Sequence, residues 1–429
     1  MADFTIHTSS LFDPQIKRFR SNVSVTVNPA SGLIVRVFER DDKVLLSDLW
    51  KAGDIDLRGR YVLPGLVDAH THIFLHSYDE AGALQQKRDE SIGERMVRAV
   101  NHCRTALLAG YTTYRDLGSE GMQEFDANIR DAVARGLTPG PRLFVATRVL
   151  ASTGSYESRT ENSAGGHCLP SSADAVDGIE ACRQAVRRRI AAGADIIKFF
   201  ADYRRRIMRY PPAQQHPYIA GVLHPPKEPN PDYMVFSKEE MQTIVAEARL
   251  ARCPVSAHCA TLEGAMAAID AGVNTIEHAY LATDKMLKRM VERNVILVPT
   301  LAIAERLHGN RFEQILSQVK RAHELGVRLA CGGDTGTYPH GENVRELELM
   351  MKAGVPVVDV LEACTVGGWE ACGGDLCGRR FGWFEAGAQA DIIALDENPE
   401  VDPEALRTVE FVMKDARVWK HNGQPMGML

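Results

Sequence analysis

Six residues of types that can bind metal ions are spread along the chain, each at the end of a short apolar run. They are His70 and His72 in "VLPGLVDAHTHIF", Lys198 in "GADIIKFF", His258 in "PVSAHCAT", His278 in "NTIEHAY" and Asp334 in "LACGGDTG". In an extended segment, residues i and i+2 point to the same side, so His70 and His72 can converge on one ion. Ligands of one site cluster in space rather than in sequence. The set therefore predicts a site for two divalent metal ions, which we expect to be Zn2+.

Each of these residues also has a structural alternative when it is taken alone. A single HxH pair arises by chance in many strands, and an isolated histidine or aspartate is more often a satisfied core or loop residue than a ligand. Their recurrence at the ends of apolar runs favours the ligand interpretation. The two glycines before Asp334 add to this, because they let other groups approach the backbone closely.

Lys198 is the most informative member of the set. Its neighbours Ile196, Ile197, Phe199 and Phe200 are apolar, and desolvation favours the neutral form of an amine. A neutral amine can react with carbon dioxide to give a carbamate, which is a carboxylate on a long arm and can bridge two cations. The alternative is a lysine that extends to solvent or pairs with an acid. We predict Lys198 to be N6-carboxylysine.

The elements expected around these residues alternate between strand and helix. Strands are predicted at residues 61–68, 111–117, 142–150, 194–200, 254–259, 274–278, 295–301 and 327–332, and helices at 91–109, 124–135, 178–192 and 237–252. Ser237 and Glu240 have the spacing of a capping box, and Gly110, Gly136, Gly193 and Gly326 suit left-handed helix ends. This α/β pattern predicts a (β/α)8 TIM barrel over residues 61–384, in which chemistry is placed at the carboxyl ends of the strands.

The two ends of the chain have a different pattern, with short alternating runs that read as antiparallel strands. We predict that residues 1–60 and 385–429 pair into one discontinuous β-sandwich domain. The alternative is two separate β-rich tails, which would leave exposed strand edges. Two long connections, residues 151–176 and 201–236, follow the third and fourth barrel strands. Loops of this length are usually functional or disordered, and we expect them to be lids.

Composition limits the classes of partner. The chain has 429 residues and a net charge of −6. Its 45% hydrophobic and 25% charged residues are typical of soluble globular proteins. The negative charge disfavours nucleic acid and anionic membranes as partners. No apolar run of membrane-spanning or secretory length is present, so we expect a cytoplasmic protein. Barrels of this kind are commonly homo-oligomers, and the sequence does not fix the number of subunits.

The nine cysteines contain no CxxC pair, which disfavours a disulfide framework. Cys253, Cys259 and Cys331 fall in predicted core strands, where free thiols behave as small apolar side chains. Coordination of the metal by Cys259 or Cys331 remains an open alternative.

Longer stretches of the sequence resemble a known family. "GRYVLPGLVDAHTH" and "FEAGAQADIIALDENP", together with the six residues, resemble the metal-dependent amidohydrolase superfamily, over about residues 50 to 400. "LLAGYTTYRDLGS", "GADIIKFF" and "AHCATLEGAMAAIDAGVNTIEHA" are most similar to the group that contains ochratoxinase, imidazolonepropionase-related enzymes and prolidase-like Xaa-Arg/Lys carboxypeptidases. The resemblance implies that His70, His72 and Asp334 hold the more buried metal, that His258 and His278 hold the other, and that carboxylated Lys198 bridges them.

The implied reaction is hydrolysis. A hydroxide shared by two metals is a nucleophile near neutral pH, and Asp334 could take its proton and pass it to the departing amine. His167, in "AGGHC", is a candidate donor to the carbonyl oxygen, or else a surface-loop residue. The stretch "DYRRRIMRY" could bind a substrate carboxylate through Tyr203, Arg204, Arg205, Arg206, Arg209 and Tyr210, with Tyr203 nearest the bridge. Alternatively, these arginines form a solvated or intersubunit face.

The leading hypothesis is a binuclear enzyme that cleaves the amide of N-acyl amino acids or dipeptides, including ochratoxin-type amides. A mononuclear deaminase or imidazolonepropionase-like hydrolase of cyclic amides is less favoured. Such enzymes typically lack a lysine in strand four and use a carboxylate soon after the strand-five histidine, whereas this chain has Lys198, and Thr261 after His258. A lactonase remains open, because the same hydroxide attacks esters. A non-catalytic scaffold is disfavoured, because all six positions carry ligand residues.

Overall fold

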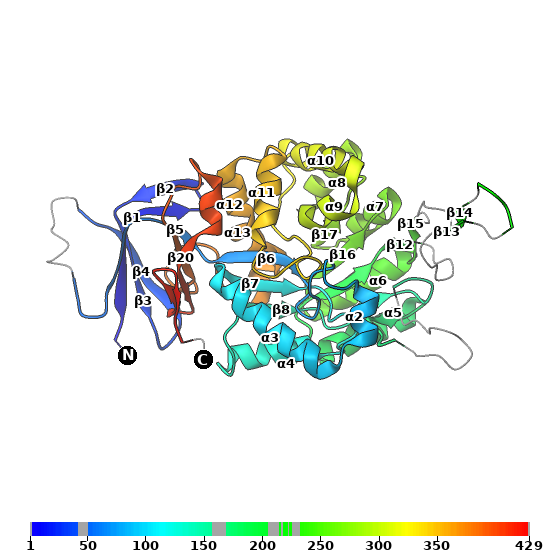
Figure 1. Cartoon of the computed structure of the whole chain (residues 1–429), viewed down its shortest axis with the longest axis horizontal. Helices are drawn as coiled ribbons and strands as arrows, with labels where there is room; N and C mark the ends of the chain where they lie inside the picture. The colour runs from blue at the N-terminus through cyan, green and yellow to red at the C-terminus, as the bar shows by residue number, and fades with distance from the viewer. Residues whose placement is uncertain are drawn as a thin grey trace.

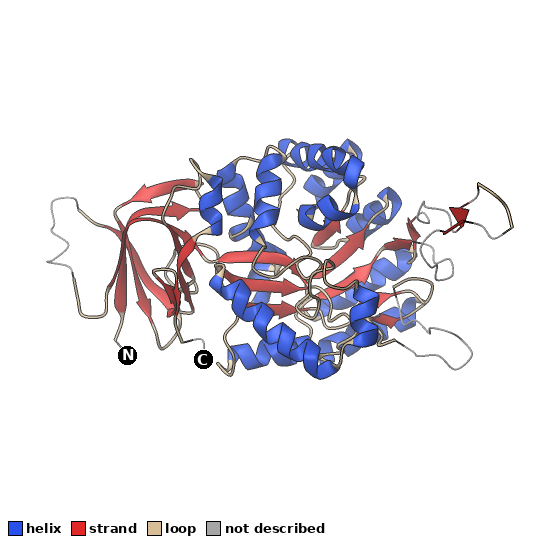
Figure 2. Cartoon of the chain, in the orientation of Figure 1, coloured by secondary structure: helices blue, strands red, loops and turns tan. Residues whose placement is uncertain are grey.

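Strands and helices alternate along most of the chain and give a mixed α/β fold (Figures 1 and 2). The computed structural model describes residues 2–41, 50–156, 169–204, 214–215, 218–221, 223–224 and 232–427. Two groups of parallel strands in the middle of the molecule carry the candidate site, and helices lie on both sides of them (Figure 2). A third, nine-stranded sheet lies at one end of the molecule, close to both termini (Figure 1).

The nine-stranded sheet is built from both ends of the chain. Its strands are β1 (Phe4–Asp13), β2 (Arg18–Ser21), β3 (Val23–Asn28), β4 (Leu33–Glu39), β5 (Ile55–Pro64), β19 (Ile392–Leu395), β20 (Val409–Lys414), β21 (Arg417–His421) and β22 (Gln424–Pro425). The two ends meet where β5 pairs antiparallel with β19. The expected antiparallel pairing is found for the other neighbours in this sheet, but β5 pairs with β1 in the parallel direction, so the expectation was wrong for this pair. The division into domains at residues 60 and 385 stays a prediction.

The central strands form two parallel sheets. The smaller contains β6 (Leu66–Thr71), β7 (Tyr111–Asp116) and β8 (Arg142–Val145). The larger has the order β10 (Ala173–Ala175), β9 (Val149–Ala151), β11 (Ile197–Phe200), β16 (Val255–Cys259), β17 (Thr275–His278) and β18 (Ile296–Val298). Nearly all residues of β6, β7, β11, β16 and β17 are buried, as expected for parallel strands covered by helices.

Backbone hydrogen bonds join the two sheets at both edges. On one side, the Asp195 amide donates to the Val145 carbonyl at 2.8 Å, which links β8 to the start of β11. On the other side, residues 328–335 lie between β18 and β6: the Ala330 amide donates to Leu297 at 3.0 Å and the Ala69 amide to Cys331 at 2.8 Å. The predicted strand at 327–332 makes one isolated bridge among the described residues, between Leu329 and Leu297, and a second bridge, between Thr335 and Thr71, follows Asp334.

Two other predicted strands are each divided in the structure. The segment 61–68 breaks at Gly65: its first part belongs to β5 in the terminal sheet, and only its second part forms β6. A Cβ on Gly65 would lie 2.2 Å from Oγ1 of Thr112, so the close approach of β7 requires glycine there. The segment 142–150 breaks into β8 and β9 around Thr147, whose φ is +58°. Apolar pattern alone did not reveal either break.

The helices are α2 (Ala83–Asp89), α3 (Ile92–Leu108), α4 (Phe125–Ala134), α5 (Ile179–Ala191), α6 (Lys238–Leu250), α7 (Leu262–Ala271), α8 (Asp284–Arg293), α9 (Leu301–Leu307), α10 (Phe312–Glu324), α11 (Val344–Lys352), α12 (Val357–Ala363) and α13 (Val366–Ala371). Short 3-10 turns are η1 (Gly309–Arg311), η2 (Gly374–Cys377) and η3 (Pro403–Arg407). The capping box of α6 is confirmed, since the Glu240 amide donates to Ser237 Oγ at 3.2 Å and the Ser237 amide to Glu240 Oε2 at 2.7 Å. The predicted glycine helix ends are also confirmed by their positive φ angles.

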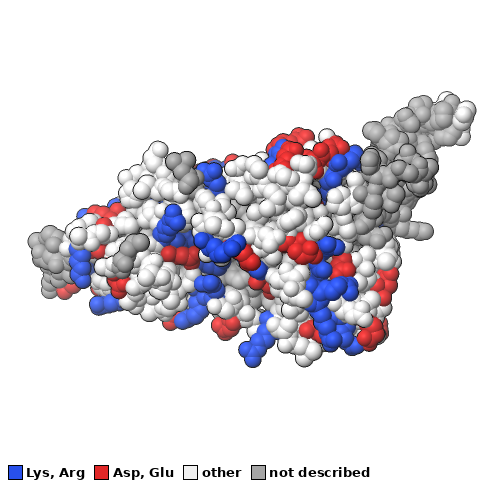
Figure 3. All heavy atoms as spheres, turned by 90° about the horizontal axis from the view of Figure 1, so that it is seen from below, with Lys and Arg blue, Asp and Glu red and all other residues white. Residues whose placement is uncertain are grey.

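The remaining short strands lie in the long connection after β11. They are β12 (Asp202–Arg204), which pairs antiparallel with β15 (Asp232–Met234), and β13 (Gln214–Gln215), which pairs with β14 (Leu223–His224). No helix in the described part of the chain is both long and apolar enough to cross a bilayer. The eight cysteines within that part are unpaired. Figure 3 shows acidic and basic side chains interspersed on the face drawn.

Candidate active site

Five of the six predicted ligands lie in, or directly after, strands of the two central sheets, and Asp334 lies in the segment between β18 and β6. His70 and His72 come at the end of β6 and just after it, Lys198 lies in β11, and His258 and His278 lie in β16 and β17. The register brings these strands together, since Phe200 pairs with His258 and Cys259 with His278. Asp334 lies near the end of the segment 328–335, and the amide of the neighbouring Thr335 donates to the His70 carbonyl at 3.1 Å.

Four imidazoles and one carboxylate converge in this region. Asp334 Oδ1 lies 3.2 Å from His72 Nε2 and 3.7 Å from His70 Nε2. The ring centroids of His70 and His278 are 5.2 Å apart, and those of His258 and His278 are 4.5 Å apart. One ligand atom from each of His70, His278 and Asp334 lies within 4.8 Å of the other two, which makes these three residues a candidate metal site.

Hydrogen bonds fix the orientation of three of these histidines. Nδ1 of His72 donates to the Gly118 carbonyl at 3.0 Å, and Nδ1 of His70 lies 2.8 Å from Glu277 Oε2. Nδ1 of His278 lies 2.8 Å from Thr300 Oγ1. When Nδ1 is held in this way, Nε2 is left as the nitrogen that can bind a metal. The partners of His70 and His72 are acceptors, so these two rings are set in the tautomer that a metal ligand needs, and the bond to Thr300 fixes the direction of the His278 ring.

Lys198 is buried without a partner. Its side chain is 3% exposed, and Nζ has no hydrogen-bond partner among the described residues. Burial lowers the pKa of Lys198 to about 8, against the opposing influence of the Glu277 charge. An orphaned amine of this kind is costly in an apolar interior unless something else occupies its hydrogen-bonding capacity. The observation fits the predicted reaction with carbon dioxide, which needs the neutral amine.

The protonation states of the candidate ligands are compatible with a bound cation. Burial lowers the pKa of His70 to about 4 and of His278 to about 3, so both rings are neutral at physiological pH. Burial opposes ionisation of Asp334, but the neighbouring histidines hold the pKa of this carboxyl well below its usual range. Burial also opposes the charge on His72, yet its hydrogen bond to Asp334 raises the His72 pKa to about 9. Protonated His72 balances the charge of Asp334, and the neutral rings of His70 and His278 are in the form of histidine that can bind a metal.

Two charged residues behind the ligands were not predicted from the sequence. The carboxylate of Glu277 accepts from Arg115 Nη2 at 2.7 Å and from the hydroxyls of Ser256 and Thr275, in addition to its contact with His70. Burial opposes its ionisation, but the charge of Arg115 holds the pKa of Glu277 well below its usual value. The available signal was the presence of one arginine and one glutamate inside segments that the sequence predicts to be strands, 111–117 and 274–278.

Asp68 is a third residue that the sequence did not single out. Its carboxylate accepts from the His70 amide at 2.9 Å, from Thr335 Oγ1 at 2.7 Å and from Asn343 Nδ2 at 2.6 Å. Burial raises the pKa of Asp68 to about 6. These bonds tie the end of β6 to the backbone beside Asp334, so they hold the two parts of the candidate site at a fixed separation.

The structure places only part of the predicted substrate contacts. The ring of Tyr203 lies 6.4 Å from that of His258, and Arg204 is exposed, with its Cζ 5.6 Å from the Tyr203 ring centroid. His167, Arg205, Arg206, Arg209 and Tyr210 lie outside the described residues. Their roles stay predictions.

Neither cysteine near the ligands joins the group of ligand atoms found within the described chain. Cys331 Sγ donates toward Met350 Sδ at 3.4 Å, and both Cys259 and Cys331 are fully buried in apolar surroundings, which raise their thiol pKa values well above normal. Thiolate is the form of cysteine that binds metals. The sulfur alternative is therefore disfavoured.

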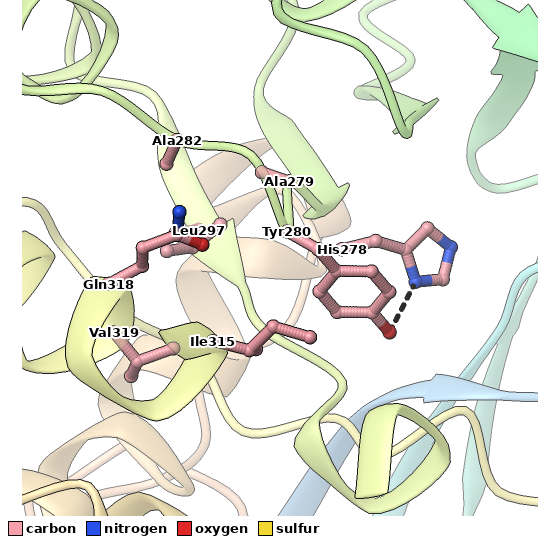
Figure 4. Close-up of a pocket in the computed structure, with 8 residues that line it drawn as sticks. All are labelled: His278, Ala279, Tyr280, Ala282, Leu297, Ile315, Gln318 and Val319. Carbon is pink, nitrogen blue, oxygen red and sulfur yellow. Dashed lines mark hydrogen bonds between the residues drawn. The ribbon is translucent and has the colours of Figure 1, made fainter. Parts of the chain in front are cut away.

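A small cavity lies behind His278 (Figure 4). Its volume is about 10 Å³, and its walls include Leu297, Ile315, Gln318 and Val319. The imidazole of His278 points away from these side chains, while the hydroxyl of Tyr280 lies 3.4 Å from His278 Nδ1 (Figure 4). A cavity of this size holds at most one water molecule, so it is not the place for a substrate.

Comparison with known proteins identifies the family. A model of the Amidohydrolase family matches residues 61–420. Ochratoxinase from Aspergillus niger is 27% identical over 405 residues, which cover 84% of this chain and 76% of that protein. A crystal structure of a Xaa-Pro dipeptidase with bound methionine in the active site has a TM-score of 0.77 and 26% identity, and covers 98% of this chain and 100% of its own.

The crystal structure of A. niger ochratoxinase has the same overall fold as this chain. Its TM-score is 0.79 at 24% identity, and the match covers 98% of this chain and 96% of that one. Because the family model spans most of the sequence, this protein belongs to the Amidohydrolase family and is an enzyme that hydrolyses amide bonds.

Proposed function

We propose that this enzyme uses two divalent metal ions to hydrolyse the amide bond of N-acyl amino acids or dipeptides. The observation that carries the proposal is the buried amine of Lys198, which has no partner in the described chain and lies in a region lined by four histidines and Asp334. Similarity to an ochratoxinase and to a Xaa-Pro dipeptidase supports a substrate with an amide next to an amino acid.

In the proposed enzyme, the central strands form a closed eight-stranded barrel. β6, β7 and β8 would continue through β11, β16, β17 and β18, and residues 328–335 would supply the eighth strand. The backbone bonds from Asp195 to Val145, from Ala330 to Leu297 and from Ala69 to Cys331 are the contacts that such closure needs. In this arrangement the six ligands would share the end of the barrel at which such enzymes place their chemistry.

The ligands would divide between two ions. His70, His72 and Asp334 would hold one, His258 and His278 the other, and the carbamate of Lys198 would bridge them. Bound ions of this kind, most simply Zn2+, polarise a substrate carbonyl and lower the pKa of bound water.

The chain's own residues would then move the proton and hold the substrate. Asp334 is anionic and would accept the proton of the attacking water at Oδ1 or Oδ2, then return it to the departing nitrogen. Tyr203 and Arg204 would bind the carboxylate of the substrate, because both lie on β12, the strand that follows the one carrying Lys198. His167 would donate a hydrogen bond to the carbonyl oxygen.

The test combines metal analysis with a hydrolysis screen of the full-length protein. We expect about two equivalents of zinc per chain and turnover of N-acyl amino acids. Lys198→Ala should lose at least one equivalent of metal and most of the activity, whereas Lys288→Ala, at an exposed position of α8, should change neither. Full metal occupancy without hydrolysis of any amide or lactone tested would contradict the proposal.

A further inference from the structure

Three aromatic rings pack against one another beside His258. The ring of Tyr156 stacks on Phe200 with centroids 4.6 Å apart and an angle of 22° between planes. Tyr203 meets both rings edge to face, at 5.4 Å from Tyr156 and 5.5 Å from Phe200. Phe200 in turn lies 4.5 Å from the ring of His258. We call Tyr156, Phe200 and Tyr203 the aromatic wall; it leads directly to a predicted metal ligand.

The two tyrosines of the wall are only partly covered. Phe200 is buried and packs on Val149, Ala151 and Ala173, whereas Tyr156 and Tyr203 lie at the edge of this cluster and keep part of their surface accessible. The face of an aromatic ring carries a partial negative charge and its edge a partial positive charge. The binding energy of a planar ring placed against such a group is therefore larger than the burial of its apolar area alone provides.

A buried ion pair holds Tyr156 in place. Lys87 Nζ lies 2.6 Å from Glu120 Oε2, and both side chains are 6% exposed. The hydroxyl of Tyr156 donates to the same Glu120 oxygen at 2.6 Å and accepts from Lys87 Nζ at 3.1 Å. Glu120 lies close to the metal ligands, since its Oε1 is 3.9 Å from His72 Nδ1. Three residues from α2, from the loop after β7 and from the loop after β9 therefore meet at one phenolic hydroxyl.

This arrangement is costly to maintain. Glu120 has a φ of +48°, in the left-handed region that side chains other than glycine seldom adopt, and a buried ion pair must offset the loss of hydration of both charges. Strained and desolvated groups of this kind cluster at functional sites, where the surrounding structure determines their conformation.

We propose that Tyr156 determines specificity: with Phe200 and Tyr203 it forms a subsite for a planar aromatic group attached to one side of the scissile amide, and Lys87 and Glu120 are the positioning residues that keep its ring there. This proposal rests on the proposed amide hydrolysis only in that the molecule carrying the aromatic group is taken to be an amide substrate. It adds a preference for substrates with a planar aromatic group, which the metal ligands themselves do not provide.

The experiment measures binding of stable substrate analogues to the full-length, metal-loaded protein. A sulfonamide replaces the amide, so that hydrolysis does not interfere. One matched pair is benzenesulfonyl-glycine and cyclohexanesulfonyl-glycine, and the second is the methanesulfonyl derivatives of phenylalanine and cyclohexylalanine. In each pair the two rings have similar size, and only one is planar. Calorimetry gives the ratio of dissociation constants within each pair.

We expect the wild type to bind the planar member of at least one pair about five-fold more tightly. Tyr156→Leu should reduce this ratio to about one while leaving the zinc content unchanged. Lys87→Met combined with Glu120→Gln removes both charges and leaves the ring, and it should lower the ratio because the ring is no longer held. Tyr61→Leu, the same change in the terminal sheet, is the matched control and should keep the wild-type ratio.

Tyr156→Phe guards against a folding defect, because it keeps the ring and removes only the hydroxyl; its ratio should fall between those of the wild type and Tyr156→Leu. Ratios near one in the wild type for both pairs, or ratios equal in the wild type and Tyr156→Leu, would overturn the proposal. A planar preference that Tyr156→Leu abolishes, in a protein that hydrolyses no amide, would support the subsite and reject the proposed function instead.

Discussion

Glu277 joins the candidate metal site to the interior of the protein. It receives hydrogen bonds from Arg115, Ser256 and Thr275 and contacts the nitrogen of His70 that faces away from Asp334. A carboxylate in this position fixes the ring of a ligating histidine and makes its other nitrogen a stronger ligand. We therefore expect Glu277 to be as important for metal binding as the ligands themselves.

Replacing Glu277 tests this role. Glu277→Gln should weaken zinc binding about 10- to 100-fold, because the carboxylate that orients His70 is lost. It should also lower the free energy of unfolding by about 3 kcal/mol, since Arg115 is left buried without a negative partner. Competition with a chelator and urea denaturation measure the two effects.

Glu346→Gln is the matched control. Burial raises the pKa of Glu346 to about 8, so this side chain is uncharged at neutral pH, and its Oε2 accepts from the Ala302 amide at 2.8 Å. An amide oxygen can take the same bond. An equal loss of zinc affinity in both variants would contradict the special role of Glu277.

At the scale of single residues, the sequence predicted candidates but not their partners. Four histidines, Lys198 and Asp334 could be selected because ligand residue types recur at the ends of apolar runs. Arg115 and Glu277 could not be paired, because a charge inside a strand does not show which distant strand carries its counterion. The ligand roles themselves stay predictions until metal is measured.

At the scale of the elements, the capping box of α6 has a measurable effect. The side chains of Ser237 and Glu240 satisfy backbone amides at the start of this helix. Ser237→Ala should lower the free energy of unfolding by about 1 kcal/mol, because one amide loses its partner. Ser317→Ala, on the exposed surface of α10, is the control and should change it by less than about 0.5 kcal/mol. Equal effects in the two variants would reject the capping argument.

The packing of α3 on the loop that contains His340 predicts a dependence of stability on pH. The ring of His102 stacks on His340 at 4.2 Å, and burial lowers the His102 pKa to about 4 from an unfolded value near 6.5. Between these values the unfolded chain binds the proton more strongly, so stability falls as the pH falls. At pH 5 this single group should cost about 2 kcal/mol relative to pH 7.5.

His102→Asn provides the check. Asparagine can still donate to the Ile73 carbonyl, which accepts from His102 Nδ1 at 2.9 Å, but it does not titrate. Urea denaturation at pH 5 and pH 7.5 should show a difference about 2 kcal/mol smaller in the variant than in the wild type. An unchanged difference would mean that His102 does not contribute.

Element boundaries show what local sequence pattern can and cannot reveal. The helices α3 to α6 were predicted to within one or two residues, because capping residues and glycines mark their ends. The breaks at Gly65 and Thr147 were missed, because each depends on a contact with a distant segment: the approach of Thr112 in one case, and the bond from the Thr147 amide to Asp126 Oδ2 in the other.

At the scale of the whole molecule, Arg142 connects the smaller central sheet to the terminal sheet. From β8, its guanidinium donates to Asp391 Oδ2 at 2.8 Å and to Asp415 Oδ1 at 2.5 Å, residues that flank β19 and β20. Burial opposes the charge on Arg142, but the two carboxylates raise its pKa further above its usual value.

Arg142→Met should lower the free energy of unfolding by about 3–5 kcal/mol, because it leaves Asp391 buried without a positive partner. Arg58→Met removes an exposed ion pair with Asp56 in the terminal sheet and should cost less than about 1 kcal/mol. Urea denaturation of the two variants makes the comparison. Similar losses in both would show that Arg142 does not hold the two sheets together.

The pairing of both chain ends in one sheet follows the pattern of the sequence, since alternating runs recur at the two ends. The direction of β1 against β5 did not follow, because alternation is the same in parallel and antiparallel strands. The segment predicted as the last strand, 327–332, does lie between β18 and β6, but its pairing is limited, within the described chain, to one isolated bridge. This interruption could not be predicted, because the contacts involve backbone groups and carry no signature in side-chain type.

The proposed carbon dioxide adduct of Lys198, which would bridge two metal ions, can be observed directly by ¹³C labelling. The full-length protein is loaded with zinc in the presence of ¹³C-bicarbonate and observed by ¹³C NMR, alongside Lys198→Met. We expect a carbamate resonance and about two zinc ions per chain in the wild type, and neither the resonance nor full occupancy in the variant. Full amide hydrolysis by a protein that takes up no label at Lys198 would contradict it.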